Sequence, residues 1–376
     1  MNHPTNHFFH HTPDSLTDWC ARHDMPAFRA RQLMEWVYVK GVADPALMTS
    51  LSARDRDLLA SEMTFISGET VAHQVASDAT QKLLVQWDDH TSPRAATSLN
   101  ILGGESCNDT SRQTECVMIP SHDEADSGAP KRRTACVSSQ VGCPVGCKFC
   151  ASGMGGLDGN LSAGRIVEQA WRLGRLEGVG RISHVVFMGM GEPLANFTNV
   201  VHAVRTLTAP WGMGISARKV TISTVGLPKA IERLAEQLDL PVTLALSLHA
   251  PTDAIRRRLI PWAEYTTIEE LLDACDSWYR KTGREITLEY TLIGRVNDRP
   301  EHARELAKVA KSLRANVNLI RLNEVKGIEF KRPTDEDVRT FQGILRDRGI
   351  NAHIRASRGR DIAAACGQLR HERVTA

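Results

Sequence analysis

The chain has 376 residues, of which 42% are hydrophobic and 24% are charged, and its formal net charge is +2 at pH 7. This composition is that of an ordinary globular protein, and it excludes a collagen-like, mucin-like or wholly disordered chain. No apolar stretch is long enough to span a bilayer, and the N-terminus lacks the basic and apolar regions of a signal peptide. We therefore expect a cytoplasmic protein with no membrane partner. The charge neither requires nor excludes a nucleic-acid partner.

The N-terminal part is predicted to contain a flexible tail followed by a small helical domain. Residues 1–12 are polar and rich in histidine, which favours a mobile tail over a metal site. Residues 13–64 show helical periodicity and predict a packed accessory domain. The helices expected there cover residues 16–24, 28–41 and 51–63.

Residues 65–135 are predicted to form a β-hairpin and long loops that lead into the next domain. The hairpin consists of two apolar runs on either side of a turn around Asp78. A stretch rich in Ser, Thr, Gly and Asn, and a second stretch that is first acidic and then basic, predict the loops. These features cover residues 71–77 and 82–88 (hairpin), 114–119 (a further strand), and 90–112 and 121–133 (loops).

Strands and helices alternate over residues 136–376, and the first predicted strand begins just before this segment. The strands are β-branched and apolar on both faces, as in a sheet that is covered on both sides. Such a series predicts a parallel sheet that closes into a partial (β/α)6 barrel, with its chemistry at the C-terminal ends of the strands. The predicted strands are 134–140, 182–189, 219–225, 242–248, 286–292, 317–322 and 350–356. The predicted helices are 163–178, 199–209, 228–238, 268–283, 301–314 and 335–349.

Nine cysteines are present, and an odd number in a chain with no export signal argues against a disulfide scaffold. Cys143, Cys147 and Cys150 follow the first barrel strand with the spacing C-x3-C-x2-C. Three thiolates on one loop suit zinc or an iron–sulfur cluster. A structural zinc site normally has a fourth ligand nearby, and no second CxxC or HxxxH follows. The pattern therefore favours a [4Fe–4S] cluster with one open iron.

This cysteine loop resembles the signature of the radical S-adenosylmethionine (SAM) superfamily. Four further motifs together resemble the RlmN/Cfr group of RNA adenine methyltransferases, over residues 13–370 of this chain. They are CVSSQVGC (136–143), GMGEP (189–193), SLHAP (247–251) and DIAAACGQL (361–369). The resemblance implies a radical SAM partial barrel with an N-terminal helical domain that binds RNA.

The resemblance also implies roles for individual residues. Cys143, Cys147 and Cys150 would bind the cluster. The implied contacts with SAM, most of them at the ends of barrel strands, are Gly191, Glu192, Ser223, Ser247, Leu248, His249 and Asn323. The implied catalytic residues are Glu115, Cys136 and Cys366. Cys20, Cys107, Cys116 and Cys275 match no motif.

An adenine C2 carbon has no nucleophilic lone pair, so direct attack on SAM is unfavourable. In the implied mechanism Cys366 accepts a methyl group from one SAM, and a second SAM yields the radical that activates this methyl group. Glu115 then removes the C2 proton, and Cys136 forms a transient disulfide with Cys366 that releases the base. The predicted insertion at 90–112 lies next to Glu115, and the pattern of the group has no such insertion.

The implied substrates are an adenosine of 23S ribosomal RNA and the adenosine 3′ of the anticodon in tRNA. An electron donor such as flavodoxin or ferredoxin is also implied. Basic residues expected to contact phosphate are Lys131, Arg132, Arg133, Arg256, Arg257, Arg258, Arg355, Arg358 and Arg360. Three alternatives remain open: Cfr-type methylation at C8, a radical SAM enzyme that acts on a small molecule, and a non-catalytic metal-binding RNA module.

Overall fold

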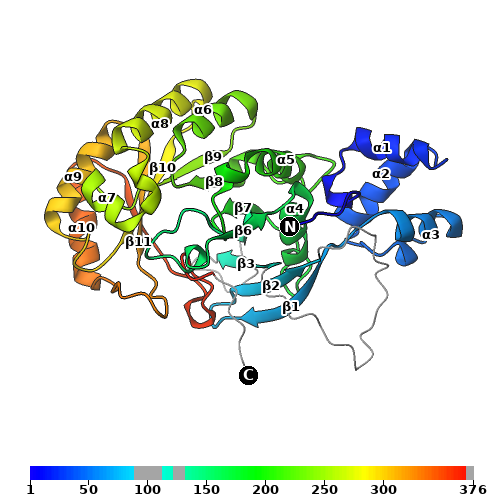
Figure 1. Cartoon of the computed structure of the whole chain (residues 1–376), viewed down its shortest axis with the longest axis horizontal. Coiled ribbons are helices and arrows are strands. Elements are labelled where there is room, and N and C mark those ends of the chain that lie inside the picture. Colours follow the sequence, from blue (N-terminus) through cyan, green and yellow to red (C-terminus); the bar gives the residue numbers. More distant parts are fainter. Residues whose placement is uncertain (89–111, 122–131, 370–376) are drawn as a thin grey trace.

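The computed structural model describes residues 1–88, 112–121 and 132–369 (Figure 1). The N-terminal helices lie at one end of the molecule, and helices α6–α10 curve around the opposite end. A ten-stranded sheet runs between the two ends. Most of the predicted loops at 90–112 and 121–133 lies outside the described residues, as do Cys107 and Lys131.

Seven consecutive strands of this sheet, counted over the described residues, are parallel and confirm the predicted partial barrel. Each pairs with the next in the order β4-β7-β8-β9-β10-β11-β12. All seven were expected from their apolar, β-branched runs. Their bounds are Arg132–Cys136 (β4), His184–Phe187 (β7), Val220–Thr224 (β8), Thr243–Ser247 (β9), Ile286–Leu292 (β10), Ala315–Arg321 (β11) and Ala352–Arg355 (β12).

Helices connect these strands and cover the sheet. The ends of α8 follow its local sequence: Thr267 and Glu270 form a reciprocal capping box, and Gly283 ends the helix with a positive φ of 64°. The short helix α7 was not predicted. The bounds are Ala163–Leu173 (α4), Phe197–Thr208 (α5), Pro228–Gln237 (α6), Asp253–Leu259 (α7), Ile268–Thr282 (α8), Pro300–Lys311 (α9) and Asp335–Asp347 (α10).

Three antiparallel strands extend the sheet beyond β4. They are β1 (Gly68–Val75), β2 (Gln81–Trp87) and β3 (Gln113–Ser121), in the order β1-β2-β3-β4. The register of β1 and β2, with Val75 opposite Gln81, confirms the predicted hairpin. The pairing of β3 with β4 places Val117 directly opposite Cys136, so their side chains lie on the same face of the sheet.

A small two-stranded sheet that was not predicted is formed by the segments just before and after the cysteine loop. It pairs β5 (Gln140–Gly142) with β6 (Leu157–Asn160). Gly142 has a φ of 75°, and a Cβ atom there would lie 2.0 Å from the carbonyl oxygen of Gly156. The strands can approach this closely only because residue 142 has no side chain.

The prediction of a flexible tail over residues 1–12 is wrong. Phe8 and Phe9 are fully buried in the main hydrophobic core. The Nε2 atom of His7 lies 3.1 Å from the buried carboxylate of Glu168 on α4. The histidines give the segment a polar composition. Burial of two adjacent phenylalanine side chains nevertheless stabilises the ordered segment by more free energy than the segment loses in conformational entropy.

The N-terminal helices are α1 (Pro13–Arg22), α2 (Phe28–Met34) and α3 (Ala53–Glu62). The helix predicted at 28–41 divides in two, because α2 passes into a turn of π-helix over Glu35–Val39. In that turn the N–H of Lys40 bonds to the carbonyl of Glu35, 2.9 Å away, five residues earlier. Such a turn has no clear signal in hydrophobic periodicity.

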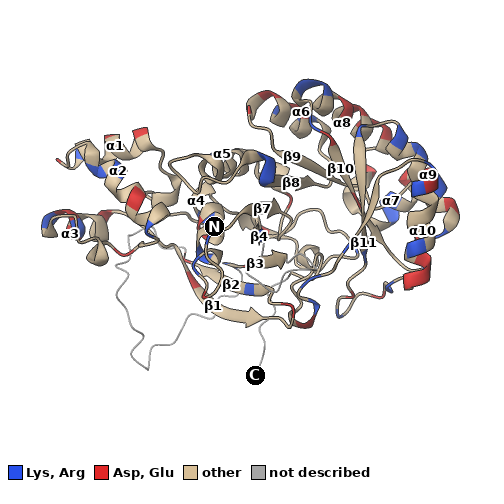
Figure 2. Ribbon diagram, turned by 180° about the vertical axis from the view of Figure 1, so that it is seen from behind, with Lys and Arg blue, Asp and Glu red and all other residues tan. Residues whose placement is uncertain are grey.

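Charged residues are spread over the outside of the molecule. Figure 2 shows acidic and basic residues mixed along the outer helices α8, α9 and α10. Among the helices of the described ranges, none has the length and apolar character needed to cross a membrane.

Candidate active site

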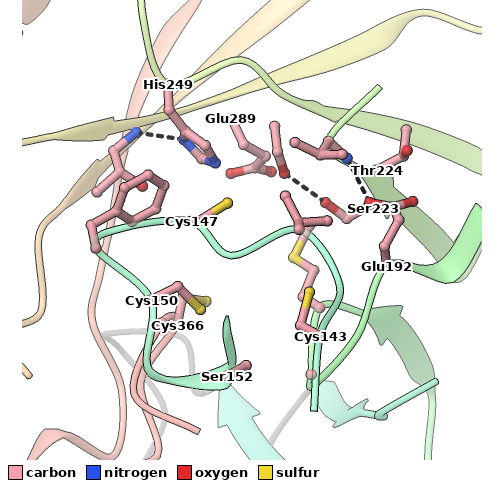
Figure 3. A pocket seen from close by; sticks show the side chains of 18 of the residues that line it. Cys143, Cys147, Cys150, Ser152, Glu192, Ser223, Thr224, His249, Glu289 and Cys366 are labelled. Atoms are coloured by element: carbon pink, nitrogen blue, oxygen red, sulfur yellow. Dashed lines mark hydrogen bonds between the residues drawn. The ribbon is translucent and has the colours of Figure 1, made fainter. Parts of the chain in front are cut away.

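The main pocket lies at the C-terminal ends of the parallel strands, where the barrel fold was expected to place its chemistry (Figure 3). The cysteine loop closes one side of it, and residues at or after the ends of β7, β8, β9, β10 and β11 form the other sides. The predicted site residues that line the pocket are Cys143, Cys147, Cys150, Gly191, Glu192, Ser223, Ser247, His249, Asn323 and Cys366.

The three cysteines of the loop all line this pocket as free thiols. Burial raises the pKa of Cys143 to about 12, and burial together with Cys150 and Cys143 raises the pKa of Cys147. Burial together with Cys366 raises the pKa of Cys150. Three half-buried thiolates side by side therefore need a cationic partner. Within the described residues no three His, Cys, Asp or Glu side chains are close enough to bind a single metal ion. Thiols arranged around a pocket fit a [4Fe–4S] cluster, in which each thiolate binds a different iron.

The carboxylate of Glu192 is fixed between two backbone N–H groups. Oε1 accepts a hydrogen bond from Leu194 at 3.0 Å, and Oε2 accepts one from Val225 at 2.8 Å. Burial raises the pKa of Glu192, while these hydrogen bonds oppose the shift. Gly191 precedes it with a φ of 102°, and a Cβ atom there would lie 2.6 Å from Gln140. The tight turn therefore requires glycine next to the carboxylate.

His249 has a positive φ of 55°, and its Nδ1 accepts a hydrogen bond from the N–H of Thr291 at 3.0 Å. Burial lowers the pKa of His249 to about 3, so the ring is neutral at pH 7. Because Nδ1 is an acceptor, the proton must be on Nε2, which can donate a hydrogen bond. The hydroxyls of Ser223 and Ser247 lie 3.2 Å apart on the neighbouring strands.

Leu248 is an exception among the implied SAM contacts. Its side chain is fully buried in the main core and does not line the pocket. Ser247 and His249, on either side of it, do line the pocket. Successive residues at the end of a strand point to opposite faces, so the middle residue of this motif points away.

Cys366 connects the main pocket to a second, smaller pocket. It lines both, and Cys136 and Arg355 line only the smaller one. Cys136 is a buried free thiol, and burial, together with Cys366, raises its pKa to about 12.

The Cys366 segment packs on the cysteine loop through two hydrogen bonds. The N–H of Ala151 donates to the carbonyl of Gly367 at 2.8 Å, and Ser152 Oγ donates to the carbonyl of Leu369 at 2.7 Å.

Glu115 does not line either of these two pockets. It is buried on β3, two residues from Val117, which packs in one cluster with Cys136 and Ala364. Its Oε1 lies 2.7 Å from Nζ of Lys82, which also donates to the carbonyl of Ala363 at 3.3 Å. Lys82 therefore connects Glu115 to the segment that carries Cys366.

Not all of the basic residues that were expected to contact phosphate are exposed to solvent. Arg256 is buried with 1% exposure, so it cannot contact phosphate as predicted. Arg355 lines the smaller pocket with Cys136 and Cys366, and its Nη1 lies 3.8 Å from the carboxylate of Glu289. Its pKa is raised, mainly by Cys366 and, against the effect of burial, also by Glu289 and Cys136. Arg132, Arg257, Arg258 and Arg360 are exposed, and Arg133 and Arg358 are half-buried.

Sequence reasoning missed Glu289, which lines the main pocket and is nearly fully buried. Burial raises its pKa, and Arg355 and Asn318 oppose the shift. Asn318 Nδ2 donates to Glu289 Oε1 at 3.0 Å. A signal was present, because Glu289 is the only charged residue in the apolar strand ITLEYTL. Thr291, on the same strand, also lines the pocket and orients His249.

Comparison with known proteins shows similarity over nearly the whole chain. Residues 137–309 match the model of the radical SAM superfamily, and residues 8–65 match that of a ribosomal RNA large subunit methyltransferase N-terminal domain. A probable dual-specificity RNA methyltransferase RlmN from Rhodopirellula baltica is 39% identical over 98% of this chain and 91% of its own length. One from Synechococcus sp. (strain CC9311) is 42% identical over 95% of this chain and 96% of its own.

Comparison with a solved structure also shows similarity over nearly the whole chain. The crystal structure of a radical SAM methyltransferase from Sphaerobacter thermophilus superposes with a TM-score of 0.87 at 38% sequence identity. The match covers 98% of this chain and 100% of that one. It includes the N-terminal helices as well as the barrel, since so little of either chain is left out.

Proposed function

The chain belongs to the RlmN family of radical SAM RNA methyltransferases, and we propose that it methylates C2 of an adenosine in 23S ribosomal RNA and in the anticodon loop of tRNA. The observation that carries the proposal is the position of Cys366, which lines both the pocket of the three loop cysteines and the smaller pocket of Cys136. A thiol in that position can receive a methyl group on one side and present it to a base on the other.

The cofactors of the family are a [4Fe–4S] cluster and SAM, with two SAM molecules used per turnover. Cys143, Cys147 and Cys150 would hold the cluster, which supplies the electron for reductive cleavage of SAM when it is bound. Glu192 would accept hydrogen bonds from the ammonium group of SAM. Ser223, Ser247, His249 and Asn323 would contact the rest of the molecule, with His249 donating through Nε2.

Cys366 would act as nucleophile and methyl carrier. Its thiolate would attack the methyl carbon of one SAM, so that the methyl–sulfur bond of SAM breaks, S-adenosylhomocysteine leaves and a thioether forms on Cys366. This splits a difficult transfer into two easier steps. Once the carbon is joined to C2 of the base, the thiolate of Cys136 would attack the sulfur of Cys366. The S–S bond forms as the S–C bond breaks, and the carbon keeps the electron pair of that bond and takes up a proton to become the methyl group of the product. Two electrons then restore both thiols, the state in which the structure holds them.

Glu115 would remove the proton from C2. Support for this role comes from its burial on the same face of β3 as Val117 and from Lys82, which connects it to the Cys366 segment. The ammonium group of Lys82, 2.7 Å from Oε1, holds this buried carboxylate in place beside the Cys366 segment.

RNA would bind over the smaller pocket, with the target adenosine turned out of its stack to reach Cys366. Arg358, which lines that pocket, and the exposed Arg360, two residues further along the chain, are the candidate phosphate contacts. Arg257 and Arg258 are exposed on α7 next to the cysteine loop. The electron donor would be a one-electron carrier such as flavodoxin or ferredoxin.

Mass spectrometry of RNA digests from cells with and without the gene tests the proposal. We expect 2-methyladenosine to disappear from ribosomal and transfer RNA when the gene is deleted, and to return when it is restored. Unchanged 2-methyladenosine, or loss of 8-methyladenosine instead, would contradict methylation at C2.

A further inference from the structure

Helix α7 carries three consecutive arginines, and only the first points into the protein. Arg257 and Arg258 are exposed, whereas Arg256 is 1% exposed. A guanidinium group loses much of its hydration when it is buried, so it needs partners inside the protein. Those partners are backbone carbonyls beside the main pocket.

The guanidinium group of Arg256 joins the ends of two neighbouring strands. Nη2 donates to the carbonyl of Val225 at 2.5 Å, just after β8, and Nε donates to that of Leu248 at 3.3 Å, just after β9. The N–H of Val225 in turn binds the carboxylate of Glu192 at 2.8 Å. Leu248 lies between two pocket residues, Ser247 and His249. One side chain thus fixes the backbone beside three of the predicted SAM contacts.

The same helix also packs on the cysteine loop. The carbonyl of Leu259, the last residue of α7, accepts a hydrogen bond from the N–H of Lys148 at 2.9 Å. Leu259 and Ile260 form one apolar cluster with Val145 and Phe149 of the loop, and Cys147 packs against it. Burial lowers the pKa of Arg256 to about 10, while Cys147 and Asp253 oppose the shift. The group is therefore still positively charged at pH 7, and it lies within electrostatic range of Cys147.

We propose that Arg256 is a positioning residue with two tasks: its hydrogen bonds hold the ends of β8 and β9 against SAM, and its buried charge favours the reduced form of the cluster that Cys147 binds. Reduction adds one negative charge in a poorly hydrated site, so a fixed positive charge nearby stabilises the product. This inference rests on the proposed function, because it requires the cluster.

Three variants of the full-length, reconstituted holoenzyme test it: Arg256→Gln, Arg256→Lys and, as a control at an exposed arginine of α8, Arg280→Gln. The readouts are iron content, the midpoint potential of the cluster from an anaerobic titration followed by electron paramagnetic resonance, and the KM for SAM in 5′-deoxyadenosine formation. Arg256→Gln should shift the potential to more negative values and raise the KM roughly tenfold or more, because hydrogen bonds from a charged group are lost.

The lysine variant separates the two tasks. Arg256→Lys keeps the charge, so its potential should stay close to that of the wild type. A single ammonium group cannot reproduce the planar fork that reaches both carbonyls, so the KM should still rise. Arg280→Gln should leave both the potential and the KM unchanged.

An Arg256→Gln holoenzyme with full iron content and unchanged potential and KM would overturn the inference, as would an equal shift in potential for Arg280→Gln. If Arg256→Gln does not fold, an Arg256→Lys enzyme with a wild-type KM for SAM would overturn the positioning task. Failure of the wild-type protein to bind iron would contradict the proposed function instead, so the two failures are distinguishable.

Discussion

The side-chain amide of Asn323 donates a hydrogen bond to the backbone carbonyl of Cys366, 3.1 Å away. Asn323 lies two residues beyond β11 and lines both pockets. A residue expected to contact SAM therefore also holds the backbone of the expected methyl carrier. Both half-reactions at Cys366 depend on the placement of this thiol, and Asn323 fixes it relative to the barrel.

Replacing Asn323 with alanine should lower the kcat of RNA methylation roughly tenfold or more. The hydrogen bond itself contributes about 1 kcal/mol, and a misplaced nucleophile costs more than the bond alone. Iron content should stay at the wild-type level. Asn351→Ala is the matched control, because Asn351 bonds to Asn316 at an exposed position. An Asn323→Ala enzyme with wild-type kcat would show that this contact does not position Cys366.

Removing one loop cysteine should abolish the cluster. In Cys147→Ala, one of the three thiolate ligands of the cluster is lost. We expect iron content and 5′-deoxyadenosine formation to fall to background after anaerobic reconstitution. Cys275→Ala, which changes a buried cysteine of α8, should retain both. A wild-type protein that takes up zinc but no iron would instead favour a non-catalytic RNA-binding module.

The ion pair of Lys82 and Glu115 should contribute to stability as well as to catalysis. Lys82→Met leaves a buried carboxylate without this partner and should lower the free energy of unfolding by about 3 kcal/mol. Urea unfolding measures the change. Lys281→Met removes an exposed pair with Glu236 and should cost less than about 1 kcal/mol. Equal effects of the two substitutions would contradict a buried, structurally important pair.

Glu168 should make stability depend on pH in the acid range. Burial alone would raise its pKa, but Arg172, His7 and Ser67 together lower it from 4.5 to about 2. A depressed folded-state pKa gives stability that is complete above pH 4.5 and is lost as the pH falls towards 2.

The free energy of unfolding of wild type minus that of Glu168→Gln should therefore shrink on acidification, by on the order of 3 kcal/mol. Glu305→Gln, at an exposed pair with Lys308, should show no such trend. A constant difference between wild type and Glu168→Gln would mean that Glu168 is not stabilised as a carboxylate.

The parallel strands and the cysteine loop could be predicted because their signals are local. Strands buried on both faces are apolar throughout, and the spacing of Cys143, Cys147 and Cys150 lies within one loop. The resemblance to a family was needed to single out Cys366, which lies more than 200 residues from that loop in the sequence.

Other features depend on tertiary contacts that the sequence does not reveal. Phe8 and Phe9 are buried because α4 and the N-terminal helices surround them, although the histidines beside them suggested a tail. Arg256 belongs to a basic run whose other members are exposed, and only the packing of α7 on the cysteine loop turns it inwards. The motif SLHAP implies contact with SAM for Leu248 as well as for Ser247 and His249, because a sequence motif does not show which of three consecutive side chains faces the pocket.

The most direct test of Cys366 as methyl carrier uses the Cys136→Ala holoenzyme with SAM, reductant and target RNA. Without the thiol of Cys136 the last step cannot occur, so the RNA should stay covalently attached to the protein. Nuclease and protease digestion followed by mass spectrometry should locate an adenosine joined through one carbon to the sulfur of Cys366. Formation of free 2-methyladenosine by a Cys366→Ala holoenzyme would contradict the mechanism.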